Sequence, residues 1–369
     1  MAVNQPGAAI DQNRMTSTLR KLAVDITAFM DSADGGEDTF NHLARELFAF
    51  QYAHNGALRR LCAQHGLTAP RVSNWREIPA TPAAAFKELE WTVVPPEERV
   101  ALFRSSGTTD PRQSRHFHSH ESLAVYEASL LRWFNSRCLA QGEVPPRLLF
   151  LTPPPKAAPH SSLVHMFDTL RRAHPGSRGA FFGGIGPADA WGLEFDGLLP
   201  ALRAGAPVAL LGTAFNFVHL LDRLTETGDR LTLPTGSFLM ETGGYKGRSR
   251  SLPREELHEA LSVALGVPRH QIVCEYGMSE LSSQAYDTAA AGTRRFQFPP
   301  WTRIQILSPE TGVEAAEGEP GLLRVCDLAN VASAVVVQTE DLAVRSGDGF
   351  ELLGRAPTAG PRGCSLMTA

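Results

Sequence analysis

The sequence predicts an α/β protein with a parallel sheet covered by helices, followed by a small antiparallel β subdomain. Between residues 121 and 277, short apolar runs alternate with segments whose apolar residues recur at helical spacing. Beyond Phe296 the chain changes to short β-rich runs broken by Gly, Pro and Asp, which is typical of antiparallel strands. With 369 residues, the chain is long enough for two or three lobes around more than one core.

The amino-terminal part is predicted to be helical. Residues 16–32 and 39–66 carry apolar side chains at helical spacing. Residues 71–89, RVSNWREIPATPAAAFKEL, contain prolines that interrupt regular elements, so we expect a connector that leads into the α/β part.

The α/β part should supply helices and parallel strands in turn. We expect a helix at 121–140, with Ser119 as its N-cap. Further helices are expected at 196–205, 218–228 and 254–266, and strands at 147–151, 207–213, 230–237 and 270–277. Ligands of such sheets lie beyond the carboxyl ends of strands. Two polar loops have that position, RSSGTTDPRQSRH after Val100–Phe103 and EYGMSE after QIVC.

The composition is that of a globular protein, with 43% hydrophobic residues, 20% charged residues and a net charge of −4. This charge provides no general basic field for nucleic acid. No uninterrupted apolar run is long enough to span a membrane. The first residues, MAVNQPGAAIDQNRM, lack the apolar core of a signal peptide, so we expect a cytoplasmic protein.

The cysteines are few and widely separated, with no C-x-x-C pair. They are Cys62, Cys138, Cys274, Cys326 and Cys364. An odd, scattered set argues against a disulfide framework and against a structural zinc site. Free cysteines usually pack as small hydrophobic residues, and we expect this of all except Cys364.

Residues 105–110, SSGTTD, gather hydroxyl groups around a glycine and precede Arg112 and Arg115. A linker, a turn and a phosphate-binding loop all use such residues. Backbone N–H groups beside a glycine, with adjacent hydroxyls, can hold phosphate oxygens, and the arginines could add charge-assisted bonds. The loop lacks the Gly-Lys-Ser/Thr of a Walker A motif.

The run HFHSH places His116, His118 and His120 at a period of two, so they could line one face of a strand. A zinc site is one interpretation. The sequence offers no second acidic or cysteine cluster to complete such a site, and surface histidines are common.

Several ordered motifs give the chain a family resemblance. SSGTTD, EYGMSE, TEDLA and LLGR occur in the order found in adenylate-forming enzymes, which include acyl-CoA synthetases, firefly luciferases and nonribosomal adenylation domains. SLVHM, GTAFNFVHLLD, ETGGYKGRSR, EYGMSELSSQAYD and PRGCSL resemble the LuxE-type long-chain fatty acyl-protein synthetases of bacterial bioluminescence more closely. The resemblance covers nearly the whole chain from about residue 15.

This resemblance implies the large domain of an adenylate-forming enzyme. Its parts would be a helical region at 1–100, an α/β nucleotide- and acyl-binding core at 101–295, a small β subdomain at 296–355 and a short tail at 356–369. The implied cofactors are ATP and Mg²⁺. The implied reaction begins when a carboxylate attacks the α-phosphate of ATP, which yields acyl-adenylate and pyrophosphate, and the acyl group then passes to a thiol.

The resemblance also assigns the nucleotide site. Phosphate binding falls to Ser105, Ser106, Gly107, Thr108 and Thr109. Tyr276 and the backbone of Gly243 and Gly244 would flank the adenine, and Ser279 would lie near the α-phosphate. Gly277 and Met278 also belong to the implied nucleotide site. Glu280 would ligate Mg²⁺, since that ion usually takes one or two carboxylates beside phosphates. Asp341 would bind the ribose hydroxyls, and Arg355 the ribose or a phosphate.

The sequence gives fewer indications of where the acyl chain binds. The LuxE-type segments SLVHM and GTAFNFVHLLD contribute His165, Phe215 and Phe217 as candidates for an apolar tunnel. The two phenylalanines could equally be core residues, because aromatic residues at helical spacing usually are.

Two departures from the family pattern affect the chemistry. Asp110 replaces the glycine that ends the phosphate motif, and the lysine that usually follows is absent. Adenylate-forming enzymes also carry a lysine on a mobile lid after the hinge, whereas only residues 356–369 follow Arg355 here. Lys246 and Arg355 are candidates to replace that lysine, because a fixed cation stabilises developing charge.

The ending PRGCSL places Cys364 where the related synthetases carry the acyl group. A thiolate is the reactive form, and the neighbouring Arg362 should favour it. The alternative is a frayed terminus with an inert thiol.

Three functions are compatible with these motifs. The first is an acyl-protein synthetase that acylates itself at Cys364 and passes the acyl group to a partner such as an acyl reductase. The second is a ligase that delivers the acyl group to CoA, a carrier protein or an amine. The third is a non-catalytic sensor or scaffold with the same fold.

Overall fold

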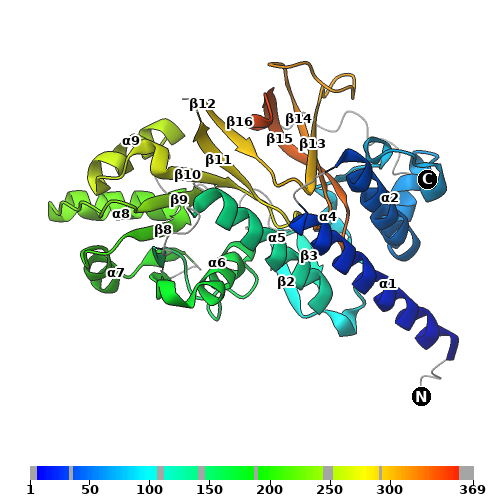
Figure 1. Ribbon diagram of the computed structural model, residues 1–369, viewed down its shortest axis with the longest axis horizontal. Helices are drawn as coiled ribbons and strands as arrows, with labels where there is room; N and C mark the ends of the chain where they lie inside the picture. Colours follow the sequence, from blue (N-terminus) through cyan, green and yellow to red (C-terminus); the bar gives the residue numbers. More distant parts are fainter. Residues whose placement is uncertain are drawn as a thin grey trace.

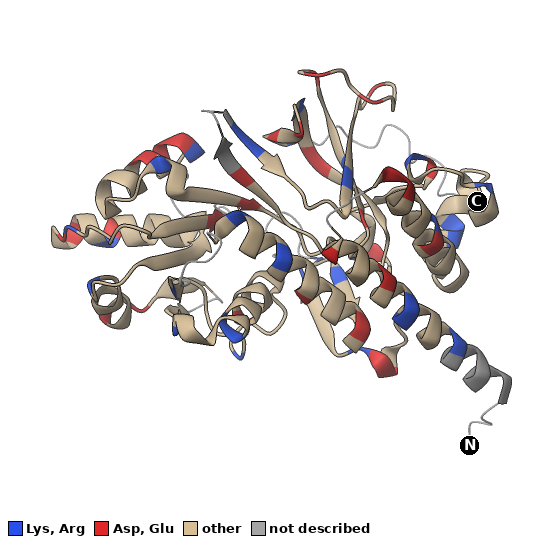
Figure 2. Cartoon of the chain, in the orientation of Figure 1, with Lys and Arg blue, Asp and Glu red and all other residues tan. Residues whose placement is uncertain are grey.

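The computed structural model describes residues 6–32, 36–105, 112–139, 146–186, 190–243, 252–290 and 293–356 (Figure 1). Within them, no helix is both long enough and apolar enough to cross a membrane. Figure 2 shows acidic and basic residues interspersed along the helices, in keeping with the small net charge of −4.

A twelve-stranded sheet joins the parallel and antiparallel parts of the protein. Its order is β13-β14-β15-β16-β12-β11-β10-β9-β8-β4-β5, and β1 pairs with β15 outside that path. The parallel strands are β4 (Arg147–Phe150), β5 (Ala180–Phe181), β8 (Val208–Thr213), β9 (Phe238–Thr242) and β10 (Ile272–Tyr276). The antiparallel strands are β11 (Ala285–Ala290), β12 (Thr293–Gln297), β13 (Thr302–Leu307), β14 (Pro320–Asp327), β15 (Val336–Ser346) and β16 (Gly349–Arg355).

Helices cover both faces of the parallel part, as the sequence predicts. In β8, Val208 and Leu210 pack with helices α7 (Phe195–Leu202), α8 (Ala214–Thr227) and α9 (Arg254–Leu265). The alternate residues Ala209 and Leu211 pack on the other face with α5 (His120–Cys138) and α6 (Ser162–Ala173). Figure 1 shows α9, α8 and α7 one below the other at the left. Strands buried on both faces are continuously apolar, which explains the run PVALLGT.

The amino-terminal part is helical and ends in an unexpected strand. Helices α1 (Pro6–Asp31), α2 (Glu37–His54) and α3 (Gly56–Gln64) share a core cluster with strands β14 and β15. The connector then forms β1 (Thr81–Pro82), which pairs parallel to β15, and the short helix α4 (Ala85–Glu88). The amino-terminal residues are therefore fixed to the same sheet as the carboxyl-terminal ones.

Two further hairpins flank the sheet. One pairs β2 (Ala101–Arg104) with β3 (Arg115–His118), so a strand, not a helix, follows the hydroxyl-rich loop. Helix α5 then begins at His120 with Ser119 as its cap. The other pairs β6 (Gly183–Ile185) with β7 (Trp191–Leu193).

The expected strand at 230–237 is wrong, because the strand begins only at Phe238. Pro234 has no N–H for a sheet ladder, and Gly236 has a φ of 88°, which turns the chain. The following residues 238–242 are all buried and form β9. Antiparallel pairing also starts earlier than expected, at β11, before Phe296.

Candidate active site

A cleft of about 860 Å³ lies at the carboxyl ends of β8, β9 and β10. On its opposite side it is lined by residues of β15 and β16. Seven residues that the sequence assigns to the nucleotide and one that it assigns to Mg²⁺, Glu280, line it; the seven are Ser105, Gly243, Gly277, Met278, Ser279, Asp341 and Arg355. These residues come from four distant parts of the chain, which the fold brings together at the edge of the sheet where α/β proteins bind ligands.

Hydrogen bonds join the hydroxyl-rich hairpin to the EYGMSE loop. The backbone N–H of Ser114 donates to Ser105 Oγ over 2.9 Å. The hydroxyls of Ser114 and Ser279 are 3.4 Å apart, and Ser279 Oγ donates to Glu280 Oε2 over 3.3 Å. The two loops therefore form one continuous polar wall of the cleft.

Glu280 is a buried carboxylate in this wall, only 5% exposed. Burial raises its pKa, and hydrogen bonds from Ser114 and Ser279 and the charge of Lys87 oppose that rise. A carboxylate that is destabilised by burial and faces a phosphate-sized cleft fits a hard cation such as Mg²⁺, which would offset the cost of its charge. No group of three His, Cys, Asp or Glu side chains with metal-binding geometry occurs in the described ranges.

The backbone of Glu280 is held by the loop after β14. Asn330 Nδ2 donates to the Glu280 carbonyl over 2.9 Å and to the Ala334 carbonyl over 2.8 Å. Asp327 accepts bonds from the N–H groups of Ser282 and Ser283. This buried network fixes the loop that carries Glu280.

Asp341 is oriented by its neighbours on adjacent strands. Tyr276 Oη donates to Asp341 Oδ2 over 2.7 Å, and Arg355 Nε lies 4.0 Å from Oδ1. Burial raises the pKa of Asp341, although Tyr276 and Arg355 counteract that rise. The Tyr276 ring packs edge-on against Phe296, Phe298 and Phe350. Tyr276 thus positions the carboxylate and is not itself a lining residue of the cleft.

A second buried carboxyl, Glu275, lies behind the cleft wall. It is 6% exposed and accepts a hydrogen bond from Thr242, which lines the cleft. Burial raises the pKa of Glu275 to about 7, with a further contribution from the charge of Glu241. A Cβ at Gly277 would collide with Glu275 Oε1, so a larger residue there would have to displace the Glu275 side chain.

The Glu275→Gln variant is expected to be more stable than the wild type at pH 8 and about equally stable at pH 4. The folded-state pKa is about 7 and the ordinary value is 4.5, so ionisation penalises the fold progressively as pH rises through this window. The full difference is on the order of 3 kcal/mol. Urea unfolding at pH 4, 6 and 8 measures it, with the exposed Glu259→Gln as control. A difference that does not grow with pH would contradict this account.

The residues proposed for the acyl chain lie outside the cleft lining. His165 Nε2 is 2.9 Å from Glu127 Oε1, and its ring packs against Phe103 and Tyr126. Phe217 is completely buried in the core between α8 and the sheet, and Phe215 contacts His219. The large apolar side chains that do line the cleft are Leu163, Ile185, Trp191 and Met278.

Some predicted site residues lie outside the described residues. They are Ser106, Gly107, Thr108, Thr109, Gly244, Lys246 and Cys364. Their assignments stay predictions.

The structure adds lining residues that the sequence motifs do not indicate. Thr213 and Thr242 are the last residues of β8 and β9. They could have been predicted, because ligands of parallel sheets bind at the carboxyl ends of strands. Lys87 lines the cleft from α4, and no sequence motif around it predicts a site residue. Arg112 and Arg115, which the sequence offers to phosphate, instead form ion pairs with Glu88 at 2.5 Å and Glu90 at 3.2 Å.

The histidine run does not form a metal site among the described residues. His116 and His118 are buried and stacked, with ring centroids 4.7 Å apart, whereas His120 is exposed. Burial lowers the pKa of His116 to about 4, so the pair is neutral near pH 7. The two rings pack as core aromatic residues beside Phe86 and Phe103.

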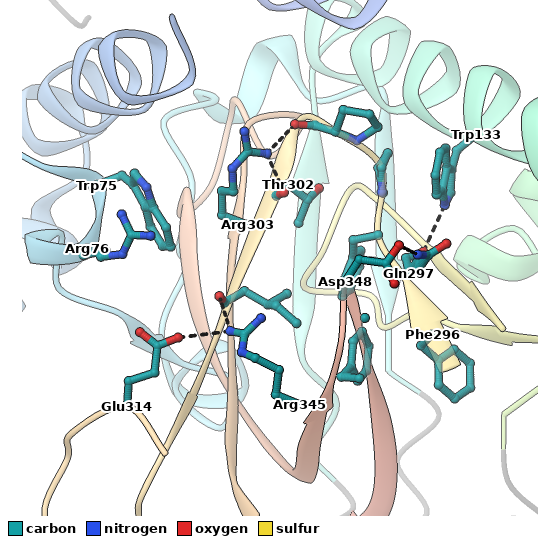
Figure 3. Close-up of a pocket in the computed structure, with 16 residues that line it drawn as sticks. Trp75, Arg76, Trp133, Phe296, Gln297, Thr302, Arg303, Glu314, Arg345 and Asp348 are labelled. Atoms are coloured by element: carbon teal, nitrogen blue, oxygen red, sulfur yellow. Dashed lines mark hydrogen bonds and ion pairs between the residues drawn. The ribbon is translucent and has the colours of Figure 1, made fainter. Parts of the chain in front are cut away.

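A smaller cavity of about 470 Å³ lies elsewhere, against the antiparallel strands. Figure 3 shows Arg345 reaching Glu314 and Gln297 lying beside Asp348. None of the predicted site residues lines it. The larger cleft is therefore the candidate active site.

Comparisons with known proteins show which proteins this chain is similar to. Residues 187–369 match the family model described as acyl-protein synthetase, LuxE. The chain is 24% identical over 351 residues to the long-chain-fatty-acid–luciferin-component ligase of Aliivibrio fischeri, covering 89% of this chain and 87% of that protein. It is also 24% identical over 174 residues to the Vibrio harveyi protein of the same description, covering 44% and 45%.

A solved structure shares the fold. The open conformation of 2-hydroxyisobutyryl-CoA ligase, in complex with 2-HIB-AMP and CoA, matches with a TM-score of 0.65 and 14% identity. The match covers 86% of this chain and 69% of that one, and it establishes the adenylate-forming fold. From the family model and this fold, we conclude that residues 187–369 match the LuxE family of acyl-protein synthetases and that the chain has the fold of adenylate-forming enzymes.

Proposed function

We propose that this ligase uses ATP and Mg²⁺ to activate a fatty acid as acyl-adenylate and then acylates its own Cys364. The observation that carries the first step is that seven predicted nucleotide-binding residues and the predicted Mg²⁺ ligand Glu280 line one cleft. The fatty acid is proposed because the relatives are named long-chain-fatty-acid ligases.

In the first step, a carboxylate oxygen attacks the α-phosphorus, a new O–P bond forms, and the bond to the bridging oxygen breaks. Pyrophosphate leaves with the electron pair, and no net proton transfer is needed. Ser105 and Ser279 would donate hydrogen bonds to phosphate oxygens, and Asp341 would accept them from the ribose. Glu280 would hold Mg²⁺, which supplies Lewis-acid stabilisation of phosphate charge when bound.

The acyl chain is proposed to lie along the apolar side of the cleft. Leu163 enters from the start of α6, whereas Ile185 and Trp191 pair across the β6–β7 hairpin. Ile185 is 42% exposed and lines the cleft, so its side chain is accessible to an acyl chain there. This surface replaces Phe217 as our first candidate for chain contact.

The second step is proposed to use the tail as a tethered nucleophile. The chain leaves β16 at Arg355, which lines the cleft, and Ala356 N–H donates to the Glu340 carbonyl over 2.9 Å. Cys364 follows eight residues later, and eight residues can span about 25 Å. The Cys364 thiolate would attack the acyl carbonyl, form a thioester and release AMP. An acyl reductase in the cytoplasm would then take the acyl group.

The test of this function is acid-dependent exchange of labelled pyrophosphate into ATP, screened over fatty, aryl and short-chain acids. Exchange with long-chain acids, and intact-mass detection of an acylated protein, are the expected results. If no acid supports exchange, the proposal is wrong and a non-catalytic protein is favoured. Exchange followed only by acyl-CoA formation would overturn the self-acylation step.

The Asp341→Ala variant is expected to raise KM for ATP about 10-fold or more, because a charge-assisted bond to the ribose is lost. Discrimination between ATP and 2′-deoxyATP should fall in the same variant. Steady-state exchange kinetics with both nucleotides measure these effects. The control is Asp348→Ala, since Asp348 lines the smaller cavity. An unchanged preference for ATP would remove Asp341 from the ribose site.

A further inference from the structure

Lys87 reaches the cleft because the amino-terminal connector is built into the sheet. Strand β1 pairs with β15 at Thr81 to Val337 and Pro82 to Gln338, and Ala83 N–H donates to the Gln338 carbonyl over 2.9 Å. The same strand β15 continues to Asp341 on the cleft wall. The connector is thereby fixed relative to the predicted ribose site.

The short helix α4 after this strand turns Lys87 toward the cleft. Ala83 and Ala84 line the cleft beside Lys87, and their small side chains leave room above the phosphate wall. Phe86 points the other way, is completely buried and packs against Trp91 and His116. The buried phenylalanine anchors the turn, so Lys87 is held on the opposite side.

We propose that Lys87 is a catalytic residue that binds the phosphate groups of ATP beside Glu280 and stabilises their charge during adenylation. This inference rests on the proposed function and names a residue that the family motifs do not. The ammonium group would keep its proton throughout, while the O–P bond to the acid forms and pyrophosphate departs with the electron pair.

The charges around the cleft favour Lys87 for this task. The other basic side chains in its lining are Arg104, Arg355 and the imidazole of His160. Arg355 lies beside Asp341, at the ribose end, and His160 Nδ1 is 3.1 Å from the Leu102 carbonyl. Lys87 lines the same cleft as Ser105, Ser279 and Glu280, the residues proposed for phosphate and metal. A triphosphate held by these residues would therefore share the cleft with the Lys87 ammonium group.

The experiment compares Lys87→Met and Lys87→Arg with a control variant, Lys21→Met. Lys21 is an exposed residue of α1 whose ammonium is 4.0 Å from Asp25. Calorimetry measures the affinity of each protein for ATP with Mg²⁺ and for adenosine, and pyrophosphate exchange measures kcat and KM. Thermal unfolding identifies any variant that fails to fold.

Lys87→Met is expected to weaken ATP binding about 10-fold or more, leave adenosine binding unchanged and lower kcat/KM by 10- to 100-fold or so. Lys87→Arg should recover part of both losses, and Lys21→Met should match the wild type. Equal losses for ATP and adenosine, or no loss for ATP, would overturn the role of Lys87. Failure of the wild type to exchange pyrophosphate would instead remove the adenylation step, while the ATP-to-adenosine comparison still decides phosphate binding by Lys87.

Discussion

Replacing Glu280 with Gln is expected to lower acid-dependent pyrophosphate exchange by about 100- to 1,000-fold, because the cleft loses the carboxylate proposed for Mg²⁺. The same change should raise Tm of the nucleotide-free protein at pH 8. Burial raises the folded-state pKa of Glu280, so ionisation disfavours the fold as pH rises above its ordinary value of 4.5. Gln cannot ionise and avoids this cost.

The two effects of Glu280→Gln separate a functional carboxylate from a structural one. Exchange kinetics across Mg²⁺ concentrations give the activity, and thermal unfolding at pH 5 and pH 8 gives the stability difference, which should be larger at pH 8. Glu314→Gln is a suitable control, because Glu314 lines the smaller cavity and pairs with Arg345 at 3.0 Å. Near-wild-type exchange by Glu280→Gln, with unchanged Mg²⁺ dependence, would contradict the metal assignment.

The Cys364→Ser variant is expected to lose the thioester-linked acyl group completely while retaining pyrophosphate exchange. The four other cysteines are poor alternatives, because burial raises the pKa of each thiol. Cys62, for example, is completely buried with a pKa raised to about 11. A buried thiol holds its proton and does not meet an acyl-adenylate in the cleft.

Incubation with ATP, Mg²⁺ and labelled fatty acid, followed by hydroxylamine treatment and intact-mass analysis, measures thioester formation on Cys364. Cys138→Ala serves as the matched control and should label like the wild type. Equal thioester labelling of Cys364→Ser and the wild type would place the acyl group elsewhere. Loss of exchange in Cys364→Ser would show that the cysteine acts before acyl transfer, against the proposed order of steps.

The fold was largely predictable from local patterns. Both faces of β8 are buried, so its residues form the continuous apolar run that is typical of a parallel strand. Ser119 caps α5, as the preference of serine for the N-cap position predicts. The strand expected at 230–237 failed because its apolar leucines pack in a loop that Pro234 and Gly236 keep out of the sheet. Pairing between β1 and β15 was not predictable, since it joins residues far apart in sequence and involves only two residues of a proline-rich connector.

The candidate site was predictable where family motifs mark it. Glu280 and Asp341 were assigned through the family resemblance, and both line the cleft. Lys87 was not found, because its position depends on the β1–β15 pairing and not on any neighbouring pattern. Phe217 was predicted as a candidate tunnel residue but lies in the core. Aromatic residues at helical spacing can line a tunnel or pack in a core, and only the three-dimensional packing distinguishes the two.

The most direct test of the nucleotide site is a crystal structure with Mg²⁺ and α,β-methylene-ATP, whose bridging carbon prevents adenylation. The account predicts triphosphate oxygens against Ser105, Lys87 and Ser279, a metal ion on Glu280, and ribose hydroxyls on Asp341. A nucleotide bound in the smaller cavity, or a triphosphate turned away from Glu280, would contradict it.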